Sequence, residues 1–590
     1  MKKTSLKLLS AILTAIILLG CASVSAVHAE GAEGDIIVLY TNDVHCGTDG
    51  YPILAAYRAS LIEQGHRVFT VDAGDAVQGE VIGALTEGGA IVEIMNAVGY
   101  DYAAIGNHEF DYTVDGLMAL AEKAEYEYLC ANFRYIPEDR LVFAPYAIAE
   151  ADGKKIAFVG IATPETYTKT TPTYFQDENG NYIYGFSADE LYATVQSAVD
   201  EAIAKGAETV IAIGHLGIAA VTEGWRSTDL IANTHGIDAF LDAHAHEVIE
   251  SADYKNDGGE DVALSSTGTK LEYFGKLTIG SDGSITTELI KPEDIDIGSL
   301  SDGAKKAHGN VKDIIDGYNA KHEYLYEVIG SSEVLLTEND AQGNWIIRAG
   351  ETNLGNFVAD AYKSITGADI AMVNGGGVRA ELKAGDITRT DLMNVNPWSN
   401  AMCVIKARGR QILDALEFGV SLMPVAHGSF PHTAGLSFEV HTYVESPVVV
   451  DGYGTFVSVK EGAPRRVRNV KVGGVPIDED AVYTLAGSEY MLLLSDYTML
   501  KECEIVEKEG LSTDAEMLIA YFTETLGGLI SEEQYGKPEG EGRMTVVDKA
   551  PAEGTTPPTG DGGIAVWCIL GVLAAAGLAA VTKKRESIQG

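Results

Sequence analysis

Short apolar runs alternate with longer, helix-compatible segments from Asp35 to about Ile290, and a polar cluster directly follows each run. Buried strands separated by helices predict a layered α/β domain, which gathers its site where the strands end. The runs occupy residues 36–40, 67–71, 102–105, 209–213 and 239–241, and the clusters are Thr41-Asn42-Asp43, Asp72-Ala73-Gly74-Asp75, Gly106-Asn107-His108, Gly214-His215 and Asp242-Ala243-His244.

The pattern changes near residue 300, where the sequence becomes polar and helix-prone. Residues 300–322 therefore predict a linker helix that follows a first domain over residues 34–295. A second α/β unit is predicted over residues 323–547, with its own glycine-rich turn at Asn374-Gly375-Gly376-Gly377.

The first residues have the order of a secretory signal peptide. Lys2 and Lys3 precede an apolar run over residues 8–19, and Val27-His28-Ala29 forms a small-residue cleavage site. Residues 1–29 are accordingly predicted to be a signal peptide. Leu18-Leu19-Gly20-Cys21 also resembles a lipoprotein cleavage box, which leaves a lipid anchor on Cys21 as an alternative.

The last residues predict attachment to the cell surface. Residues 548–560 read as a spacer that ends in Thr556-Pro557-Pro558-Thr559-Gly560, and residues 564–590 hold an apolar stretch and a basic tail. This order resembles the sorting signal of Gram-positive surface proteins, although Thr556 replaces the usual leucine. The expected partner is cell-wall peptidoglycan, joined by a sortase. A plain transmembrane anchor is the alternative.

Charge and cysteine content narrow the function further. A formal net charge of -44 argues against a nucleic-acid polymer as partner, because such binding depends on Lys and Arg. It does not exclude a small phosphate ester, since bound cations reverse the local field. The six cysteines include no Cys-x-x-Cys pair, so a zinc knuckle is not expected.

The polar clusters combine residue types that bind divalent metals. Asp43 and His45 lie two positions apart, so their side chains would point to the same side of an extended segment. The full candidate set is Asp43, His45, Asp75, Asn107, His215, His244 and His246. These types suit zinc or manganese first, with magnesium as a third choice. A bridging carboxylate holds two cations roughly 3.5–4 Å apart in phosphoesterases, where they activate water and polarise the phosphate. Asp75 lies centrally in the order of these ligands along the chain and is therefore the expected bridge between the two cations.

The order Asp-x-His, Gly-Asp, Gly-Asn-His-Glu, Gly-His and His-x-His resembles the calcineurin-like metallophosphatases. The longer motifs Asn107-His108-Glu109-Phe110-Asp111 and Gly74-Asp75-Ala76-Val77-Gln78-Gly79 narrow the resemblance to the 5′-nucleotidase/UDP-sugar hydrolase family. It covers roughly residues 35–547. It implies a four-layer metallophosphatase sandwich joined by a helix to a second α/β, substrate-binding domain.

The resemblance also implies residue roles. Asp43, His45, Asp75 and His246 would hold one ion, and Asp75, Asn107, His215 and His244 the other. His108 would stabilise the transferring phosphate, supported by Asp111, unless it is a structural turn histidine. Positions that contact the nucleotide would be Arg348, Asn374, Gly377, Arg379, Trp398, Tyr490 and Asp496.

Two features depart from the family pattern. Ala243 and Ala245 flank His244, where glycine and a small polar residue are more usual, and Met-Leu-Leu-Leu-Ser replaces a glycine-rich turn after Tyr490. The aromatic residues Trp398 and Tyr490 would clamp a base, with core packing as the alternative.

The function expected from these features is a secreted, surface-anchored 5′-nucleotidase that releases phosphate from nucleoside 5′-phosphates. A UDP-sugar or a 2′,3′-cyclic nucleotide is the alternative substrate. Aspartate at position 111 favours the nucleotidase, because the cyclic phosphodiesterase branch is expected to have asparagine there. A surface adhesin on an inactive enzyme fold would have lost metal ligands, and none is lost.

Overall fold

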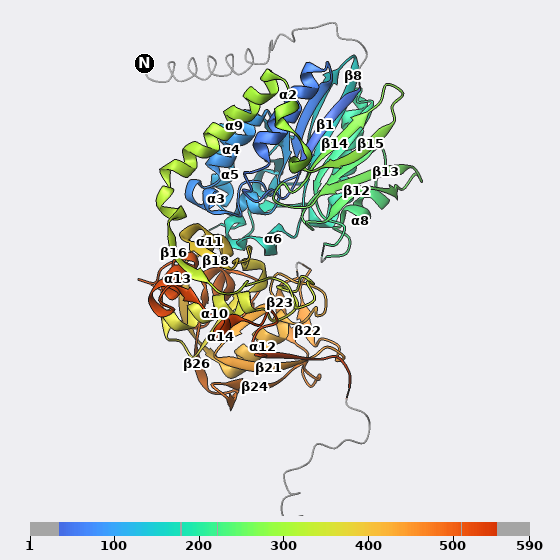
Figure 1. The fold of residues 1–590 in the computed structure, drawn as a ribbon. Helices are drawn as coiled ribbons and strands as arrows, with labels where there is room; N and C mark the ends of the chain where they lie inside the picture. The colour runs from blue at the N-terminus through green and yellow to red at the C-terminus, as the bar shows by residue number, and fades with distance from the viewer. Residues whose placement is uncertain (1–34, 178–179, 221, 453, 509, 551–590) are drawn as a thin grey trace, which may run out of the picture.

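A computed structural model describes residues 35–177, 180–220, 222–452, 454–508 and 510–550, and these form two α/β halves, one above the other in Figure 1. The predicted signal peptide, Cys21, the Thr556–Gly560 motif and the anchor at 564–590 lie outside the described residues. Among the residues that are described, no helix combines the length and apolar character needed to cross a bilayer.

The first half contains two six-stranded sheets. One has the order β15-β14-β1-β2-β3-β4. Its strands are β1 Ile36–Thr41, β2 Arg67–Asp72, β3 Tyr102–Ala104, β4 Glu127–Leu129, β14 Phe274–Ile279 and β15 Ile285–Ile290. Strand β1 pairs in parallel with β2, and all six of its residues are buried. A continuous apolar run is what a strand covered on both faces requires.

The other sheet has the order β12-β13-β11-β10-β8-β7. Its strands are β7 Tyr146–Ala151, β8 Lys154–Ala162, β10 Thr209–His215, β11 Ala239–Asp242, β12 Val248–Lys255 and β13 Asp261–Thr267. Edge strand β12 alternates partly buried with exposed positions and carries Glu250, Asp253 and Lys255 on its length. Charged side chains of this kind protect an edge from pairing with another chain.

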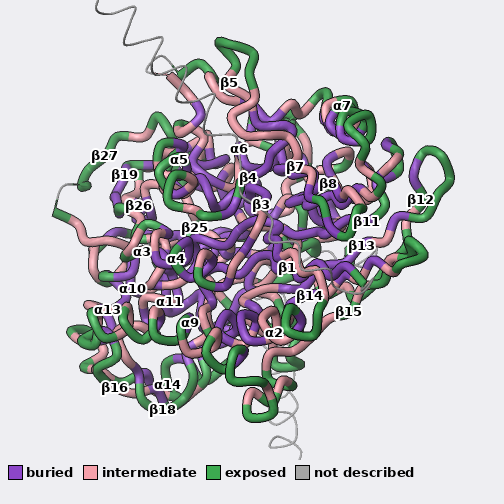
Figure 2. The backbone as a smooth tube through the Cα atoms, turned by 90° about the horizontal axis from the view of Figure 1, so that it is seen from above, coloured by how far each residue is buried: buried purple, intermediate pink, exposed green. Residues whose placement is uncertain are grey.

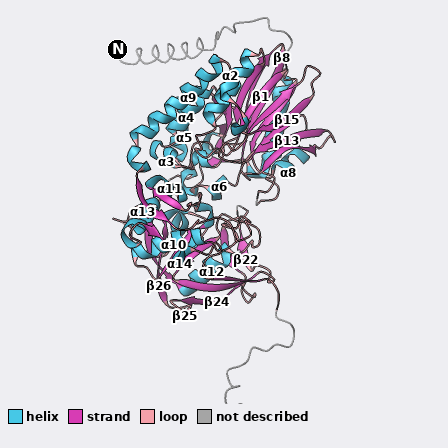
Figure 3. Ribbon diagram, in the orientation of Figure 1, coloured by secondary structure: helices cyan, strands magenta, loops and turns pink. Residues whose placement is uncertain are grey.

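Helices cover the outer face of each sheet, which completes the four layers that the sequence predicted (Figure 3). One core lies between the sheets and contains Val38, Phe158 and Ile213. The other two cores lie between a sheet and its helices. Figure 2 shows buried backbone gathered near the middle of the molecule, around β1, β3 and β4. The helices are α2 Tyr51–Glu63, α4 Gly89–Val98 and α5 Thr113–Lys123 on one side and α7 Leu191–Ala204 and α8 Ser227–Ala232 on the other.

The long helix α9, Asp302–Lys321, lies within the predicted linker 300–322. Ser301 caps its first turn by accepting a hydrogen bond from the Ala304 amide at 3.0 Å. The helix packs along α2 and α4, and Tyr318 donates a hydrogen bond to Glu93 of α4 at 2.6 Å. Helix α9 is therefore part of the first half, and the chain crosses to the second half after Lys321 (Figure 1).

The second half is built on a five-stranded sheet of order β20-β17-β26-β19-β27. Its strands are β17 Ile370–Asn374, β19 Met402–Arg408, β20 Pro431–Ala434, β26 Val482–Ser488 and β27 Glu504–Glu507. Helices α10 Asn353–Thr366, α11 Arg389–Val395 and α13 Asp514–Ala520 pack on one face, and α12 Gly409–Gly419 packs on the other. Two smaller sheets, of order β18-β16-β28 and β25-β24-β21-β29, flank it. Their strands are β16 Val328–Ser332, β18 Gly385–Thr388, β21 Leu436–His441, β24 Val467–Val472, β25 Val475–Pro476, β28 Leu529–Ile530 and β29 Met544–Val547. The observed α/β fold agrees with the prediction.

Candidate metal centre and interdomain cavity

The loops after the parallel strands adopt an unusual backbone conformation. The φ angles are positive at five of the seven candidate ligands, namely Asp43 (49°), His45 (46°), Asp75 (61°), His244 (73°) and His246 (56°). The expectation of an extended Asp43-Val44-His45 segment was therefore wrong. Because β1 pairs with β2, the amides of Asp43 and His45 donate to the carbonyls of Gly74 and Asp75 at 2.9 Å, and the chain turns to make these bonds.

The folded chain brings the candidate ligands to one place. The potential ligand atoms form three groups, in each of which all atoms lie within 4.8 Å of one another: Asp43, His45 and His246; Asp75, His215 and His244; and His45, Asp75 and His108. The first group contains the predicted ligands of one ion except Asp75. The second group contains the predicted ligands of the other ion except Asn107. The third includes His108, which the sequence assigned to the phosphate.

Backbone carbonyls orient two of the histidines. His45 Nδ1 donates to the Gln78 carbonyl and His215 Nδ1 donates to the Ala73 carbonyl, both at 2.9 Å. Such bonds fix the tautomer and leave the lone pair of Nε2 for a metal. His215 Nε2 lies 3.1 Å from Asp75 Oδ2. Burial, together with the charges of Arg379 and His246, holds the pKa of His45 well below its usual range, so its imidazole is neutral.

These residues fit divalent cations. The amide oxygen of Asn107 is buried and has no hydrogen-bond partner among the described residues. A buried acceptor without a partner costs about 1–3 kcal/mol, and a cation would satisfy it. His45 Nε2 and His246 Nε2 lie only 3.1 Å apart, so two basic nitrogens converge on the same space. Carboxylate, imidazole and amide donors around that space suit zinc or manganese.

Two buried glutamates that the sequence analysis did not assign hold this arrangement. Glu109 accepts hydrogen bonds from the amides of Asp75, Ala76 and Gly106 at 2.7–2.9 Å, and so ties two ligand loops together. Burial and the charge of Asp75 raise the pKa of Glu109 to about 7. Glu165 accepts from His244 Nε2 at 3.1 Å, and His244 belongs to the group with Asp75 and His215. Glu109 lies inside the quoted Asn-His-Glu motif, whereas no motif signals Glu165.

His108 is held by its own carboxylate. Its Nδ1 donates to Asp111 Oδ2 at 2.6 Å, and Thr170 donates to the other oxygen of Asp111 at 2.7 Å. Burial alone would lower the pKa of His108, but the charges of Asp75 and Asp111 outweigh it and raise the pKa. A protonated ring with Nδ1 occupied presents Nε2–H as a charged donor.

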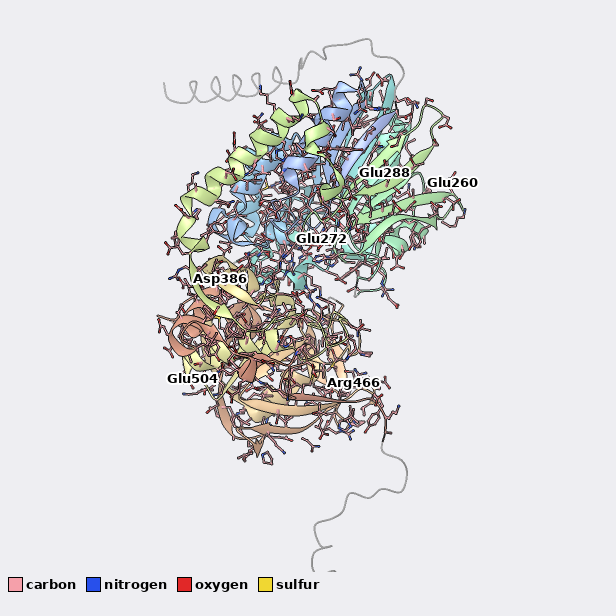
Figure 4. All side chains as sticks on the ribbon, in the orientation of Figure 1. Glu260, Glu272, Glu288, Asp386, Arg466 and Glu504 are labelled. Atoms are coloured by element: carbon pink, nitrogen blue, oxygen red, sulfur yellow. The ribbon has the colours of Figure 1, made fainter. Side chains whose placement is uncertain are left out.

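A cavity of about 1270 Å³ lies between the two halves of the molecule. Asp75, Asn107, His108, His244 and His246 line it from the first half. Every candidate substrate residue lines it from the second half: Arg348, Asn374, Gly377, Arg379, Trp398, Tyr490 and Asp496. Glu272, which Figure 4 labels near the boundary between the halves, also lines the cavity from the first half. The cavity thus joins four of the seven predicted metal ligands to the whole predicted substrate set.

Two arginines face the metal centre from the second half. Arg379 donates from its guanidinium to His45 Nε2 at 3.1 Å, and the same guanidinium lies 5.3 Å from the centre of the Trp398 ring. Arg348 lies 5.5 Å from the Trp345 ring. Its buried Nε has no hydrogen-bond partner in the described chain, and burial with the charge of Arg379 lowers its pKa to about 10. Both guanidinium groups still carry a full charge at neutral pH.

The two aromatic residues occupy different positions in the cavity. The Trp398 ring lies 5.1 Å from the His108 ring, and its Nε1 donates to the Gly377 carbonyl at 2.8 Å. Tyr490 reaches the first half as well, with its hydroxyl 3.5 Å from the Thr168 carbonyl. Trp398 therefore borders the metal centre in addition to the cavity, which the sequence did not predict.

The remaining substrate candidates lie along one wall. Asp496 accepts from the Ser429 hydroxyl at 2.5 Å, and burial raises its pKa. Asn374 ends strand β17, and its amide donates to the Gly428 carbonyl at 3.4 Å. Gly377 closes the turn Gly375–Gly377 that follows.

Comparisons with known proteins agree with this geometry. Residues 36–248 match the calcineurin-like phosphoesterase family, and residues 328–502 match the 5′-nucleotidase C-terminal domain. The chain is 27% identical over 477 residues to a 5′-nucleotidase of Vibrio parahaemolyticus, covering 72% of this chain and 81% of that protein. It is also 27% identical over 524 residues to the trifunctional nucleotide phosphoesterase protein YfkN of Bacillus subtilis, covering 79% of this chain but only 34% of that longer protein.

The fold has a close counterpart among solved structures. The structure of a 5′-nucleotidase precursor from Thermus thermophilus superposes with a TM-score of 0.71 at 24% identity. The match covers 88% of this chain and all of that one. At this identity the likeness establishes the two-domain architecture alone.

Proposed function

From the premise that this chain is a metal-dependent phosphoesterase, with a calcineurin-like N-terminal half and a 5′-nucleotidase C-terminal half, we propose that it hydrolyses nucleoside 5′-phosphates to nucleoside and phosphate. One observation carries the proposal. Metal-binding side chains from one half and two arginines from the other line the same cavity, which also has aromatic walls.

The first half supplies the chemistry of phosphate cleavage. Asp43, His45, Asp75, Asn107, His215, His244 and His246 would hold two divalent ions. Bound ions of this kind polarise phosphoryl oxygens and lower the pKa of water. His108, protonated and fixed by Asp111, donates from Nε2 to the phosphoryl oxygens as negative charge develops on them.

The second half selects the substrate. Arg379 and Arg348 present guanidinium donors to the phosphate, a geometry that suits its oxygens. Tyr490 and Trp398 offer ring faces to the nucleoside, and Asp496 accepts hydrogen bonds from its hydroxyl groups. Asn374 and Gly377 line the same cavity and would contact the nucleotide from its wall.

The test is phosphate release from a panel of phosphate esters after chelation, with zinc, manganese or magnesium added back singly. The panel contains AMP, UMP, ADP, ATP, UDP-glucose, cyclic nucleotides and a simple aryl phosphate. We expect the nucleoside monophosphates to have the highest kcat/KM. A preference for the aryl phosphate over every nucleotide contradicts the proposal.

The size of the cavity favours a second candidate substrate class. Its volume of about 1270 Å³ exceeds the roughly 300–1,000 Å³ of typical ligand pockets and leaves space for more than a nucleoside monophosphate. A nucleoside diphosphate joined to a sugar, such as UDP-glucose, is therefore the alternative, and the same panel separates it from the monophosphates.

We also propose that the protein is secreted and joined to the cell wall. The motif Thr556-Pro557-Pro558-Thr559-Gly560 and the apolar and basic segments behind it support this location. Digestion of the cell wall should release a protein that ends at Thr559. Release by detergent but not by wall digestion would favour the membrane or lipid anchor.

A further inference from the structure

One loop joins three segments of the substrate wall. Residues 425–430 lie between helix α12 and strand β20, and the sequence analysis did not single them out. The His427 amide donates to the Arg348 carbonyl at 2.9 Å. The Gly376 amide donates to the Gly428 carbonyl at 2.8 Å, and the Gly375 amide to the Phe430 carbonyl at 2.6 Å. This loop, hereafter the 425–430 loop, therefore holds both the arginine segment and the glycine-rich turn.

The same loop holds the third part of the wall. Ser429 donates from its hydroxyl to Asp496, and Tyr497 donates from its hydroxyl to the Ser429 carbonyl. Three segments far apart in the sequence thus meet at the 425–430 loop. These bonds fix the position of the loop relative to Arg348, the glycine-rich turn and Asp496, as a selective site requires.

His427 is the polar side chain that this loop presents to the cavity without a partner. It lines the cavity, and its Nδ1 is buried with no hydrogen-bond partner in the described part of the chain. Hydrogen bonds on either side fix its backbone, because its amide binds Arg348 and its carbonyl accepts from Phe430 at 3.0 Å. Its ring meets Phe418 edge-on at 6.4 Å, so one side of the imidazole is already packed.

The ring is suited to hydrogen bonding with a neutral group. Burial and the charge of Lys169 lower the pKa of His427 to about 3, so it carries one donor nitrogen and one acceptor nitrogen at neutral pH. The last torsion of a histidine side chain has a broad, roughly two-fold profile, so either edge can turn towards the cavity. An unpaired ring nitrogen in such a place favours a ligand that supplies the missing partner.

We propose that His427 is a specificity-determining residue that hydrogen-bonds the nucleoside part of the substrate. The proposal rests on the function proposed above, because it takes the substrate to be a nucleotide. The metal centre and the arginines act on the phosphate, so His427 contributes to recognition and not to phosphate cleavage.

The experiment compares His427→Ala and His427→Phe with the unchanged protein. Phenylalanine keeps an aromatic ring and removes both nitrogens. Val425→Ala is the matched control, since Val425 lies on the same loop, lines the same cavity and is 64% exposed. Steady-state kinetics with AMP, ribose 5-phosphate and an aryl phosphate give KM and kcat. Inhibition of aryl phosphate hydrolysis by adenosine gives a second readout, which does not require nucleotide turnover.

Loss of one neutral hydrogen bond should raise the KM for AMP and the inhibition constant of adenosine roughly 3- to 10-fold in both variants. The kinetics with aryl phosphate and the behaviour of Val425→Ala should remain unchanged. If the KM for ribose 5-phosphate rises equally, the contact is to the ribose, and if it does not, the contact is to the base.

Equal losses with AMP and aryl phosphate would show that His427 is structural and would overturn the proposal. So would unchanged constants with every ligand. Unmodified protein that neither cleaves AMP nor responds to adenosine, yet cleaves aryl phosphate, would overturn the proposed function together with this role.

Discussion

Replacing His108 with alanine separates phosphate stabilisation from metal binding. His108 Nε2 is the free donor of a ring that Asp111 fixes at 2.6 Å. Removal of one donor aimed at developing charge typically lowers kcat by about 10²–10³-fold, or roughly 2.7–4 kcal/mol of transition-state stabilisation. The charges of Asp75 and Asp111 outweigh burial and raise the pKa of His108, which favours the protonated ring as the donor that the variant removes.

The assay pairs kcat on an aryl phosphate with metal content by elemental analysis. An aryl phosphate avoids the nucleoside wall, so a change in kcat reports the metal centre alone. The variant should keep the metal content of the unchanged protein, whereas His246→Ala should lose metal. His108 also belongs to a group with His45 and Asp75 that is compact enough to hold an ion. Loss of metal from His108→Ala would show that this group is a binding site and would refute the assigned role.

Three further predictions follow from the same geometry. Asp75→Asn should lose metal and reduce activity by more than the roughly 10–100-fold typical of residues that only support a ligand; normal metal content with normal turnover would contradict this. Trp398→Ala combined with Tyr490→Ala should lower kcat/KM for AMP on the order of 10²-fold, since each stacked ring contributes about 1–3 kcal/mol. The kcat/KM for aryl phosphate should fall far less. Equal losses with both substrates would show that the rings are structural. Asp111→Asn removes a charge that raises the pKa of His108. Because protonated His108 is lost as pH rises through that pKa, the alkaline decline of kcat should move to lower pH. An unchanged pH profile of kcat would contradict the role of Asp111 in setting the His108 pKa.

The sequence predicted which side chains converge at the candidate metal centre, because their position follows from a simple rule. Parallel strands are recognisable as short apolar runs, and their carboxyl ends meet at one edge of a sheet. Asp43, Asp75 and Asn107 each follow such a run in one sheet, so their convergence depends on the topology and not on fine detail. His215 ends strand β10 of the second sheet, and it joins them because the two sheets pack together.

Backbone conformation and supporting contacts were not predictable in this way. The positive φ of His45 depends on its amide reaching the Asp75 carbonyl, a contact between loops far apart in sequence. Glu165 reaches His244 from a different loop, with no local pattern to mark it. The 425–430 loop has neither a charge pattern nor a periodic one, and its importance appears only when three distant segments pack against it.

The residues with positive φ at the metal centre lower the stability of the fold while supplying side chains that the proposed activity needs. Side chains other than glycine cost about 1–2 kcal/mol each in this conformation, although aspartate and histidine tolerate it better than most. His246→Gly would relax the backbone and remove a candidate metal ligand in the same step. A search for more heat-resistant variants would therefore find substitutions at these loops that fold better and catalyse less. Engineering for stability should leave these five positions unchanged and seek its gains in the outer helices and exposed strand edges.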